Sequence, residues 1–388
     1  MTLIELASAS NLLALICFIL LIIQLGYAFG LYNQLHRTFK KQKGKELSGD
    51  FPPLSVIMVT KDSGTALKEN LPSILEQDYP MFEVIVINDK SAGEDENVLK
   101  LLGNQYHHLY YSFIPETARY ISRKKLGIAM GIKASRYDWI VVTEPQCKPV
   151  SNQWLKSLAT HFTPDTDIVL GYSNYHNQEK KGFARHIRLD GMFQAMRYLG
   201  RAANKHPYMG IGRNLAYRKS LYQNHKGFTS QLNLQRGEDD LFINAVASST
   251  NTKVAINPES IVRLPVPPYK RIWFEDKINA QVTGYYYRGK ARILNSIETW
   301  SCALFHIMTL VGLICCIQTS QWMATGIIGA SWAIRFASYM TILKRTSKDL
   351  QEDFCCSLPF FDLFRPLSSL QIKILYWLRN KADFLRKG

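Results

Sequence analysis

Three long apolar runs constrain this chain most, because each is long enough to cross a lipid bilayer as a helix. They cover residues 12–31, 297–317 and 322–343. A helix needs about 20 residues to span the hydrocarbon core. A cleaved signal peptide is the alternative for the first run, but no basic residue precedes that run. We therefore predict an uncleaved transmembrane anchor over residues 10–32.

Clusters of basic residues at the ends of these runs predict the orientation of the chain. The clusters follow the first run and the last run, and positively charged flanks favour the cytoplasmic side. We therefore expect a basic juxtamembrane linker over residues 33–51 and a transmembrane hairpin over 297–343 whose "QTSQ" turn faces outward. Residues 52–289 then lie in the cytoplasm, and the protein is a multi-pass protein of the inner (cytoplasmic) membrane.

The net charge of +16 alone would also permit a nucleic-acid-binding protein. However, the basic residues gather at the membrane boundaries rather than along one recognition element, so we expect contact with membrane lipids and no nucleic acid. Arg335 lies inside the third apolar run and must face a partner helix, a polar pocket or the interface.

The C-terminal segment, residues 354–388, is apolar but interrupted by proline and charged residues. We interpret it as an interfacial segment whose residues 367–385 form an amphipathic helix. That helix lies either on the inner membrane surface or against the soluble domain.

The seven cysteines show neither disulfide spacing nor metal-ligand spacing. All of them except Cys147 lie in or beside the apolar segments. This usage agrees with a reducing compartment.

The middle of the chain alternates short apolar strands with helices. Such alternation predicts an α/β fold with a mostly parallel sheet covered on both faces. Ligands of these sheets bind at the carboxyl ends of the strands. The expected strands are residues 54–60, 82–89, 107–114 and 138–144, and the expected helices between them are 66–77, 94–102 and 122–135.

Acidic residues follow the strands at points where one ligand could touch them all. Asp89 ends the second strand, Glu144 ends the fourth, and the triplet Glu238-Asp239-Asp240 opens a further helix. Helix capping would explain one acid of the triplet, but three exceed what a cap needs. The pair Lys124-Lys125 precedes the fourth strand on a predicted helix, where a solvated helix face would explain it.

In their order and spacing these segments resemble the family 2 glycosyltransferases, whose nucleotide-sugar-binding domain has the GT-A fold. The resemblance covers about residues 52–289, and the flanking apolar runs suit a bacterial membrane-anchored branch of the family. The matching segments are "SVIMVTKDSG", "VIVINDKS", "KKLGIAMGIKASRYDWIVVTEPQCKP", "GIGRNLAYRKSLY", "KGF" and "GEDDLF".

The resemblance implies a nucleotide site at the ends of the first two strands. Thr60 and Asp62 would line the nucleotide pocket, and Asp89 would hydrogen-bond the base. Lys124 or Lys125 would approach the nucleotide or its phosphates.

The resemblance also implies a catalytic position in the acidic triplet. Asp239, with Glu238 beside it, would be the general base that deprotonates an acceptor hydroxyl. A single displacement follows, so the anomeric carbon would invert. The further substrate-binding residues that the resemblance implies are Arg213 and Asn214, interpreted as part of a strand after a glycine-rich turn, together with Asp240 and Trp273.

The Asp-x-Asp motif of the family reads Glu144-Pro145-Gln146 here. Hard cations prefer charged oxygen ligands, whereas Gln146 offers only a neutral carbonyl oxygen. We expect a divalent cation, Mg²⁺ or Mn²⁺, that Glu144 and Gln146 hold loosely together with the donor diphosphate. The alternative is a metal-free enzyme in which Lys124-Lys125 or Arg213 neutralises the leaving diphosphate.

A second departure lies after the catalytic helix, where the family carries a Gln-x-x-Arg-Trp-like element. The local candidate is "YKRIWFEDKINAQ", in which Asp276 and Asn279 stand near the expected glutamine and arginine. Arg271, Trp273 or Lys277 could take over the role of that element.

We therefore expect a membrane-anchored, inverting glycosyltransferase. Its donor is a nucleotide sugar, and its acceptor is a hydroxyl of a lipid-linked or membrane-proximal glycan. The alternative is a catalytically degenerate protein of the same fold that acts as a nucleotide-binding or partner subunit.

Overall fold

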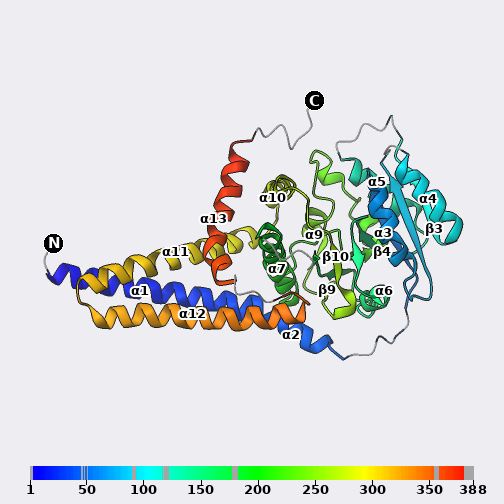
Figure 1. Cartoon of the computed structure of the whole chain (residues 1–388). Coiled ribbons are helices and arrows are strands. Elements are labelled where there is room, and N and C mark those ends of the chain that lie inside the picture. The colour runs from blue at the N-terminus through cyan, green and yellow to red at the C-terminus, as the bar shows by residue number, and fades with distance from the viewer. Residues whose placement is uncertain are drawn as a thin grey trace.

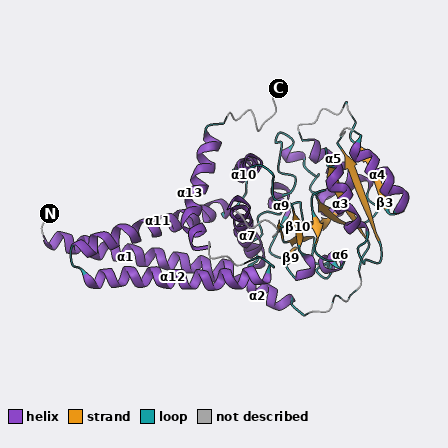
Figure 2. Ribbon diagram, viewed as in Figure 1, coloured by secondary structure: helices purple, strands orange, loops and turns teal. Residues whose placement is uncertain are grey.

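A bundle of three long helices projects from one side of an α/β domain in the computed structural model (Figure 1). The strands are confined to the α/β domain (Figure 2). The structure describes residues 3–44, 47, 49, 51–89, 93–115, 117, 122–176, 182–353 and 358–379.

The N-terminal part of the bundle is one continuous helical rod. It comprises α1 (Leu3–Tyr27), a single π-helical turn η1 (Ala28–Tyr32) and α2 (Asn33–Gln42). The first part of the expected linker is therefore helical. The reason is that Leu35 and Phe39, one helical turn apart, are both buried in the same hydrophobic core as the α/β domain.

The expected hairpin corresponds to α11 (Ala291–Gln318) and α12 (Trp322–Asp349), which pack against α1. Within the described residues, three helices are long and apolar enough to cross a membrane. They are Ala9–Gln42, Ala291–Gln318 and Trp322–Asp349.

The central sheet has seven strands. The four strands at one side of it are parallel to one another, as the sequence predicts. A small second sheet of three strands lies beside it. The large sheet contains β3 (Leu109–Phe113), β2 (Phe82–Asn88), β1 (Leu54–Thr60), β4 (Trp139–Thr143), β8 (Leu215–Arg218), β6 (Ile168–Gly171) and β9 (Thr252–Ala255), in this spatial order. The small sheet contains β5 (Lys148–Pro149), β10 (Val262–Leu264) and β7 (Ser173–Tyr175).

Helices cover both faces of the large sheet, which explains why β1 is apolar at nearly every position. Val56 packs in the core that includes α3 and α4, whereas its neighbour Ile57 packs in the core that includes α5 and α7. The helices of the α/β domain are α3 (Gly64–Leu75), α4 (Glu94–Gln105), α5 (Arg123–Ala134), α6 (Trp154–Ala159), α7 (Gly182–Ala203), α8 (Lys219–Asn224), α9 (Asp240–Val246) and α10 (Lys270–Gly284).

Two glycines let α5 approach β1 closely. A Cβ atom at Gly131 would lie 2.6 Å from Ile57 Cγ2, and one at Gly127 would lie 2.8 Å from Val59 Cγ2. Any larger side chain would push the helix away from the strand. The spacing "GIAMG" therefore sets the position of α5, whose first turn carries Lys124.

The strand register brings the polar strand ends together at one edge of the sheet. Thr60 pairs with Asn88 at the ends of β1 and β2, and β4 runs parallel to β1 and ends at Thr143. Strand β8 is antiparallel to β4, with Leu215 opposite Val142, so the residues before β8 reach the same edge. Arg213 and Asn214 were expected within a strand, but they lie in the turn that precedes β8.

Helix α13 (Leu358–Trp377) lies across the junction between the bundle and the α/β domain (Figure 1). It contacts α10 of the domain and α11 of the bundle, while Leu367, Ile374 and Trp377 are exposed. It begins before the expected residue 367, and residues 380–385 of the expected helix lie outside the described residues.

A buried carboxylate connects four elements at this junction. Glu298 of α11 is 1% exposed, and its Oε1 accepts hydrogen bonds from Tyr32 of η1 at 2.6 Å and from Arg365 of α13 at 2.5 Å. Arg197 of α7 pairs with its Oε2. The bundle and the α/β domain are therefore held together by ion pairs inside a packed interface.

A second buried polar cluster surrounds Arg335 of α12. Its guanidinium lies 2.6 Å from Asp362 of α13 and donates to Gln24 Oε1 of α1 at 3.0 Å. The sequence required Arg335 to face a partner helix, a polar pocket or the interface, and the buried cluster meets that requirement.

Glu298→Gln should destabilise the protein strongly, because it removes the buried charge that pairs with Arg365 and Arg197. Breaking a buried ion pair costs about 3–5 kcal/mol. Thermal unfolding in detergent micelles measures the change. Glu275→Gln is the matched control: Glu275 pairs with Arg379 at a partly exposed site, and such pairs contribute about 0–1 kcal/mol. Equal losses in the two variants would contradict a special role for Glu298.

Candidate active site

A cavity of about 320 Å³ lies at the edge of the sheet where β4 ends, between the loops and the helices α7 and α10. It brings together eight of the residues that the sequence singled out. They are Lys124, Glu144, Gln146, Arg213, Glu238, Asp239, Asp240 and Trp273.

The acidic triplet is positioned by a glycine and a helix cap. Gly237 has a φ of +111°, a conformation that residues with a side chain rarely adopt. Asp239 is the N-cap of α9, and its Oδ1 accepts from the backbone N–H of Asp240 at 2.8 Å. Its Oδ2 accepts from the backbone N–H of Gly212 at 2.7 Å. The Asp239 carboxylate is thus fixed at the cavity wall by two main-chain donors.

Glu144 is surrounded by donors. Lys124 Nζ lies 2.7 Å from its Oε1, while Arg213 Nε lies 3.4 Å and the Gln146 amide nitrogen 2.8 Å from its Oε2. Burial acts to raise the pKa of Glu144, but the charges of Lys124 and Arg213 outweigh it and lower that pKa to about 2. Glu144 is therefore ionised throughout the physiological range.

The same atoms decide whether these residues fit a divalent cation. Lys124 Nζ lies between two carboxylates, 2.7 Å from Glu144 and 3.1 Å from Glu238. Burial acts to lower the pKa of Lys124, but the two carboxylates outweigh it and raise that pKa above its usual range. A charged ammonium thus occupies the point where a cation would bridge the acids. A divalent cation held by Glu144 and Gln146 would therefore compete with Lys124 and Arg213 for the Glu144 carboxylate.

The three acids of the triplet differ in their surroundings. Asp240 accepts hydrogen bonds from Thr283 and, at 2.8 Å, from Tyr287. Burial, followed by the charge of Asp239, raises the pKa of Asp240 to about 7. Burial, followed by the charge of Glu238, also raises the pKa of Asp239. Glu238 Oε2 is buried and has no hydrogen-bond partner among the described residues, so it can still accept a hydroxyl of a ligand.

Helix α10 supplies one wall of the cavity with Trp273, Asp276 and Lys277, which share one helix face. Lys277 pairs with Asp190 of α7 and donates to Gln194 Oε1 at 3.0 Å. The sequence analysis missed Asp190 and Gln194. Their signal is a spacing of four residues on a helix whose neighbouring positions are apolar, and that signal is too weak to be specific.

Five residues that the sequence assigned to substrate lie outside this cavity. Thr60 is fully buried and donates to Asp95 at 2.6 Å, so its hydroxyl holds the start of α4. Asp62 is exposed and has a φ of +47°. Asp89 pairs with Arg123 and lies 3.8 Å from Lys61. The proposed nucleotide contacts of Thr60, Asp62 and Asp89 thus remain predictions.

Lys125 and Asn214 are buried and bonded to the main chain. Lys125 Nζ donates to the carbonyls of Gln231, Leu234 and Arg236 at 2.7, 2.8 and 2.9 Å, and burial lowers its pKa to about 8. It therefore supports the loop that precedes the acidic triplet. The Asn214 amide donates to the carbonyls of Tyr172 and Ser260, and its oxygen accepts from Trp154, which ties the turn before β8 to the second sheet.

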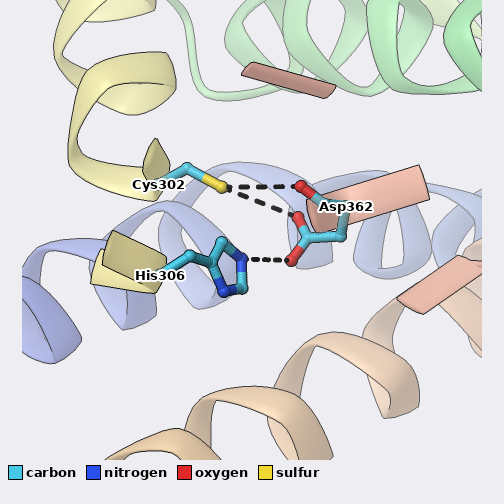
Figure 3. Close-up of side chains that lie close together, drawn as sticks. All are labelled: Cys302, His306 and Asp362. Atoms are coloured by element: carbon cyan, nitrogen blue, oxygen red, sulfur yellow. Dashed lines mark hydrogen bonds and ion pairs between the residues drawn. The ribbon is translucent and has the colours of Figure 1, made fainter. Parts of the chain in front are cut away.

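A second group of possible metal ligands lies at the junction of bundle and domain. Among the described residues, Cys302, His306 and Asp362 offer ligand atoms within 4.8 Å of one another (Figure 3). The Arg335 guanidinium lies 2.6 Å from Asp362 and 3.3 Å from Cys302 Sγ. Because this guanidinium already supplies a positive charge, we interpret the group as part of the buried polar cluster.

Comparisons with known proteins show what the α/β domain is similar to. Residues 55–226 match the model of the glycosyl transferase family 2. A solved structure of the mannosyltransferase PcManGT from Pyrobaculum calidifontis, in complex with GDP-Man and Mn²⁺, superposes with a TM-score of 0.54 at 16% identity. That alignment covers 95% of this chain and 100% of the other chain.

Structures of S. aureus TarS (residues 1–349) are more distant. One has a TM-score of 0.43 at 15% identity, and the complex with UDP-GlcNAc has 0.42 at 14%; both alignments cover 78% of this chain and 93% of the other. No curated protein sequence matches the chain. Residues 55–226 are therefore similar to the glycosyl transferase family 2, and the chain has the GT-A fold.

Proposed function

We propose that the protein is a membrane-anchored, inverting glycosyltransferase that moves a sugar from a nucleotide-sugar donor to a hydroxyl of a lipid-linked or membrane-proximal glycan. The observation that carries this proposal is the fixed Asp239 carboxylate in a cavity that also holds Lys124 and Arg213. A carboxylate base can activate the acceptor hydroxyl, and two positively charged side chains can stabilise the leaving diphosphate.

Asp239 is the best placed general base of the triplet. Asp240 is occupied by Thr283 and Tyr287, and Glu238 is paired with Lys124. Asp239 takes the proton of the acceptor hydroxyl while that oxygen forms a bond to the anomeric carbon. The bond from this carbon to the diphosphate breaks on the opposite face, and the configuration inverts. The raised pKa of Asp239 strengthens it as a base.

Lys124 and Arg213 are suited to stabilise the leaving diphosphate. Both are held at Glu144, so their positive charges are in place before the donor binds. Preorganised charge aimed at a leaving group is an effective form of catalysis. The sequence analysis favoured a weakly bound divalent cation, whereas the position of Lys124 between Glu144 and Glu238 favours the metal-free alternative.

The same cavity argues against a catalytically degenerate subunit. A degenerate protein has no need to keep Asp239 fixed at the cavity wall by two main-chain donors. We therefore favour an active enzyme.

The bundle supports a position at a membrane. Its three apolar helices all join the α/β domain at one end (Figure 1). With the basic clusters on the domain side of these helices, we propose that the catalytic domain lies in the cytoplasm. An active site tethered there meets lipid-bound acceptors most readily.

Asp239→Asn should lower the transfer rate by about 10²–10⁴-fold, because the amide cannot accept the proton. Donor binding, measured by calorimetry, should stay within a few-fold of wild type. The wild-type rate should also fall as the pH drops through the raised pKa of Asp239, since a protonated carboxyl is no base. Asp78→Asn, at an exposed ion pair with Lys156 outside the cavity, serves as control. Full transfer by Asp239→Asn would refute the assignment.

Exhaustive chelation should leave wild-type transfer intact, because Lys124 and Arg213 supply the positive charge. Lys124→Ala should then lose activity that added Mn²⁺ does not restore. Gln146→Asp tests the other hypothesis by adding a carboxylate beside Glu144. Transfer assays with and without Mn²⁺ measure each case. Loss of wild-type activity on chelation, with recovery on Mn²⁺ addition and a stronger response in Gln146→Asp, would restore the cation hypothesis.

Two engineered cysteines test the orientation. Gln318 ends α11 beside the hairpin turn, and Lys253 lies in β9 on the catalytic domain; both are exposed. In intact spheroplasts of a bacterial host, an impermeant thiol reagent should label Gln318→Cys but not Lys253→Cys. Lysis should make both reactive, and the unmodified chain gives the background. Labelling of Lys253→Cys before lysis would reverse the proposed topology.

A further inference from the structure

A second cavity of about 620 Å³ lies where α1 and α11 meet the α/β domain. Its apolar wall includes Ile23 of α1 and Leu294 of α11, which belong to two of the helices that could cross a membrane. Its polar side carries Arg201, Arg288 and Lys290, and no acidic side chain is among the described residues that line it. The cavity therefore combines an apolar wall with unopposed positive charge.

Arg201, in the last turn of α7, is the central feature of this cavity. It is 8% exposed, and its Nε has no hydrogen-bond partner among the described residues. One Nη donates to Asn295 Oδ1 at 3.1 Å, and the guanidinium lies over the Tyr208 ring. No carboxylate of the described chain forms an ion pair with it, whereas Arg197, one turn earlier, pairs with Glu298. A buried guanidinium without a counter-charge is unfavourable, so the site is suited to an anion.

The chemistry of the walls narrows the anion to a lipid phosphate. The planar guanidinium group matches the oxygens of a phosphate. Arg288 and Lys290 are exposed at the rim, where they add positive charge. A free phosphate would use these cations but leave the apolar wall of α1 and α11 without a partner. A phosphorylated lipid uses both, with its chain continuing along the two helices.

The cavity also shares a wall with the active site. His206, Pro207 and Tyr208 line the second cavity, and the next residues, Met209 and Gly210, line the active-site cavity. Consecutive residues of one segment therefore line both cavities.

We propose that this cavity holds the phosphate of the lipid acceptor, with Arg201 as its main ligand. Only the identification of this lipid as the acceptor rests on the proposed function. The binding site itself follows from the cavity and from the unpaired buried arginine. The occupant is a single lipid phosphate that carries the acceptor glycan, not the bulk phospholipid of the membrane.

Binding of farnesyl phosphate to the full chain in neutral phosphatidylcholine nanodiscs tests the site. Wild type should bind farnesyl phosphate at least 10-fold more tightly than farnesol or inorganic phosphate. Arg201→Gln should weaken that binding at least 10-fold, and Arg201→Lys should restore part of it. Arg292→Gln is the matched control, because Arg292 is exposed nearby but does not line the cavity. It should bind as wild type does.

Two further measurements separate the possible outcomes. Unchanged donor binding in Arg201→Gln shows that this variant is folded. If Arg201→Gln does not bind the donor, a double variant at the rim replaces it. This variant, Arg288→Gln with Lys290→Gln, should also weaken the binding of farnesyl phosphate. Equal binding of farnesol, equal competition by phosphatidylglycerol, or unchanged binding in both variants would overturn the proposal. Arg201-dependent binding without any sugar transfer would keep the site and refute the proposed function alone.

Discussion

The Glu298 carboxylate is the interaction on which the arrangement of both cavities depends. It receives Arg197 from α7, Arg365 from α13 and Tyr32 from η1. Burying these charges costs solvation energy, so an apolar interface of equal packing could be as stable. The ion pairs instead require one geometry, because a shifted helix would leave a buried charge without a partner. They therefore fix the rotation and position of α7 relative to the bundle.

Helix α7 passes that constraint on to both sites. Asp190 and Gln194 face the active-site cavity, and Arg201 faces the second cavity. Arg197 lies between them in sequence, at the point where the helix is held by Glu298. One helix, α7, thus forms part of the wall of both cavities. The helical bundle therefore sets the position of side chains in both cavities.

Much of the fold follows from sequence because hydrophobic periodicity reports burial directly. The four parallel strands and the three apolar helices were predictable in this way, whereas Arg213 was assigned to the site only by the resemblance to the family 2 glycosyltransferases. The two adjacent lysines show where the prediction stops. Neighbouring helix positions point about 100° apart, so Lys124 reaches the acids while Lys125 supports a loop. The packing of α5 on β1 decides which of the two lysines faces the acids, and no local sequence pattern encodes this orientation.

Residue pairs that join distant segments were beyond reach for a related reason. Asp362 and Arg335 each look like a misplaced charge in an apolar run, and only tertiary packing pairs them. Thr60 illustrates the opposite error. It stands at a strand end, where ligands bind in sheets of this kind, yet its hydroxyl is taken by Asp95.

The segment 206–213 shows how closely the two cavities are connected. Its first residues line the second cavity, the backbone N–H of Gly212 holds Asp239, and Arg213 pairs with Glu144. Tyr208 packs edge-on against Tyr287, which donates to Asp240. A displacement of this segment at Tyr208 would therefore change the support of the acidic triplet as well as the position of Arg213. Because this one segment lines the second cavity and supports the active-site residues, a molecule bound in the second cavity would also affect the geometry of the active site.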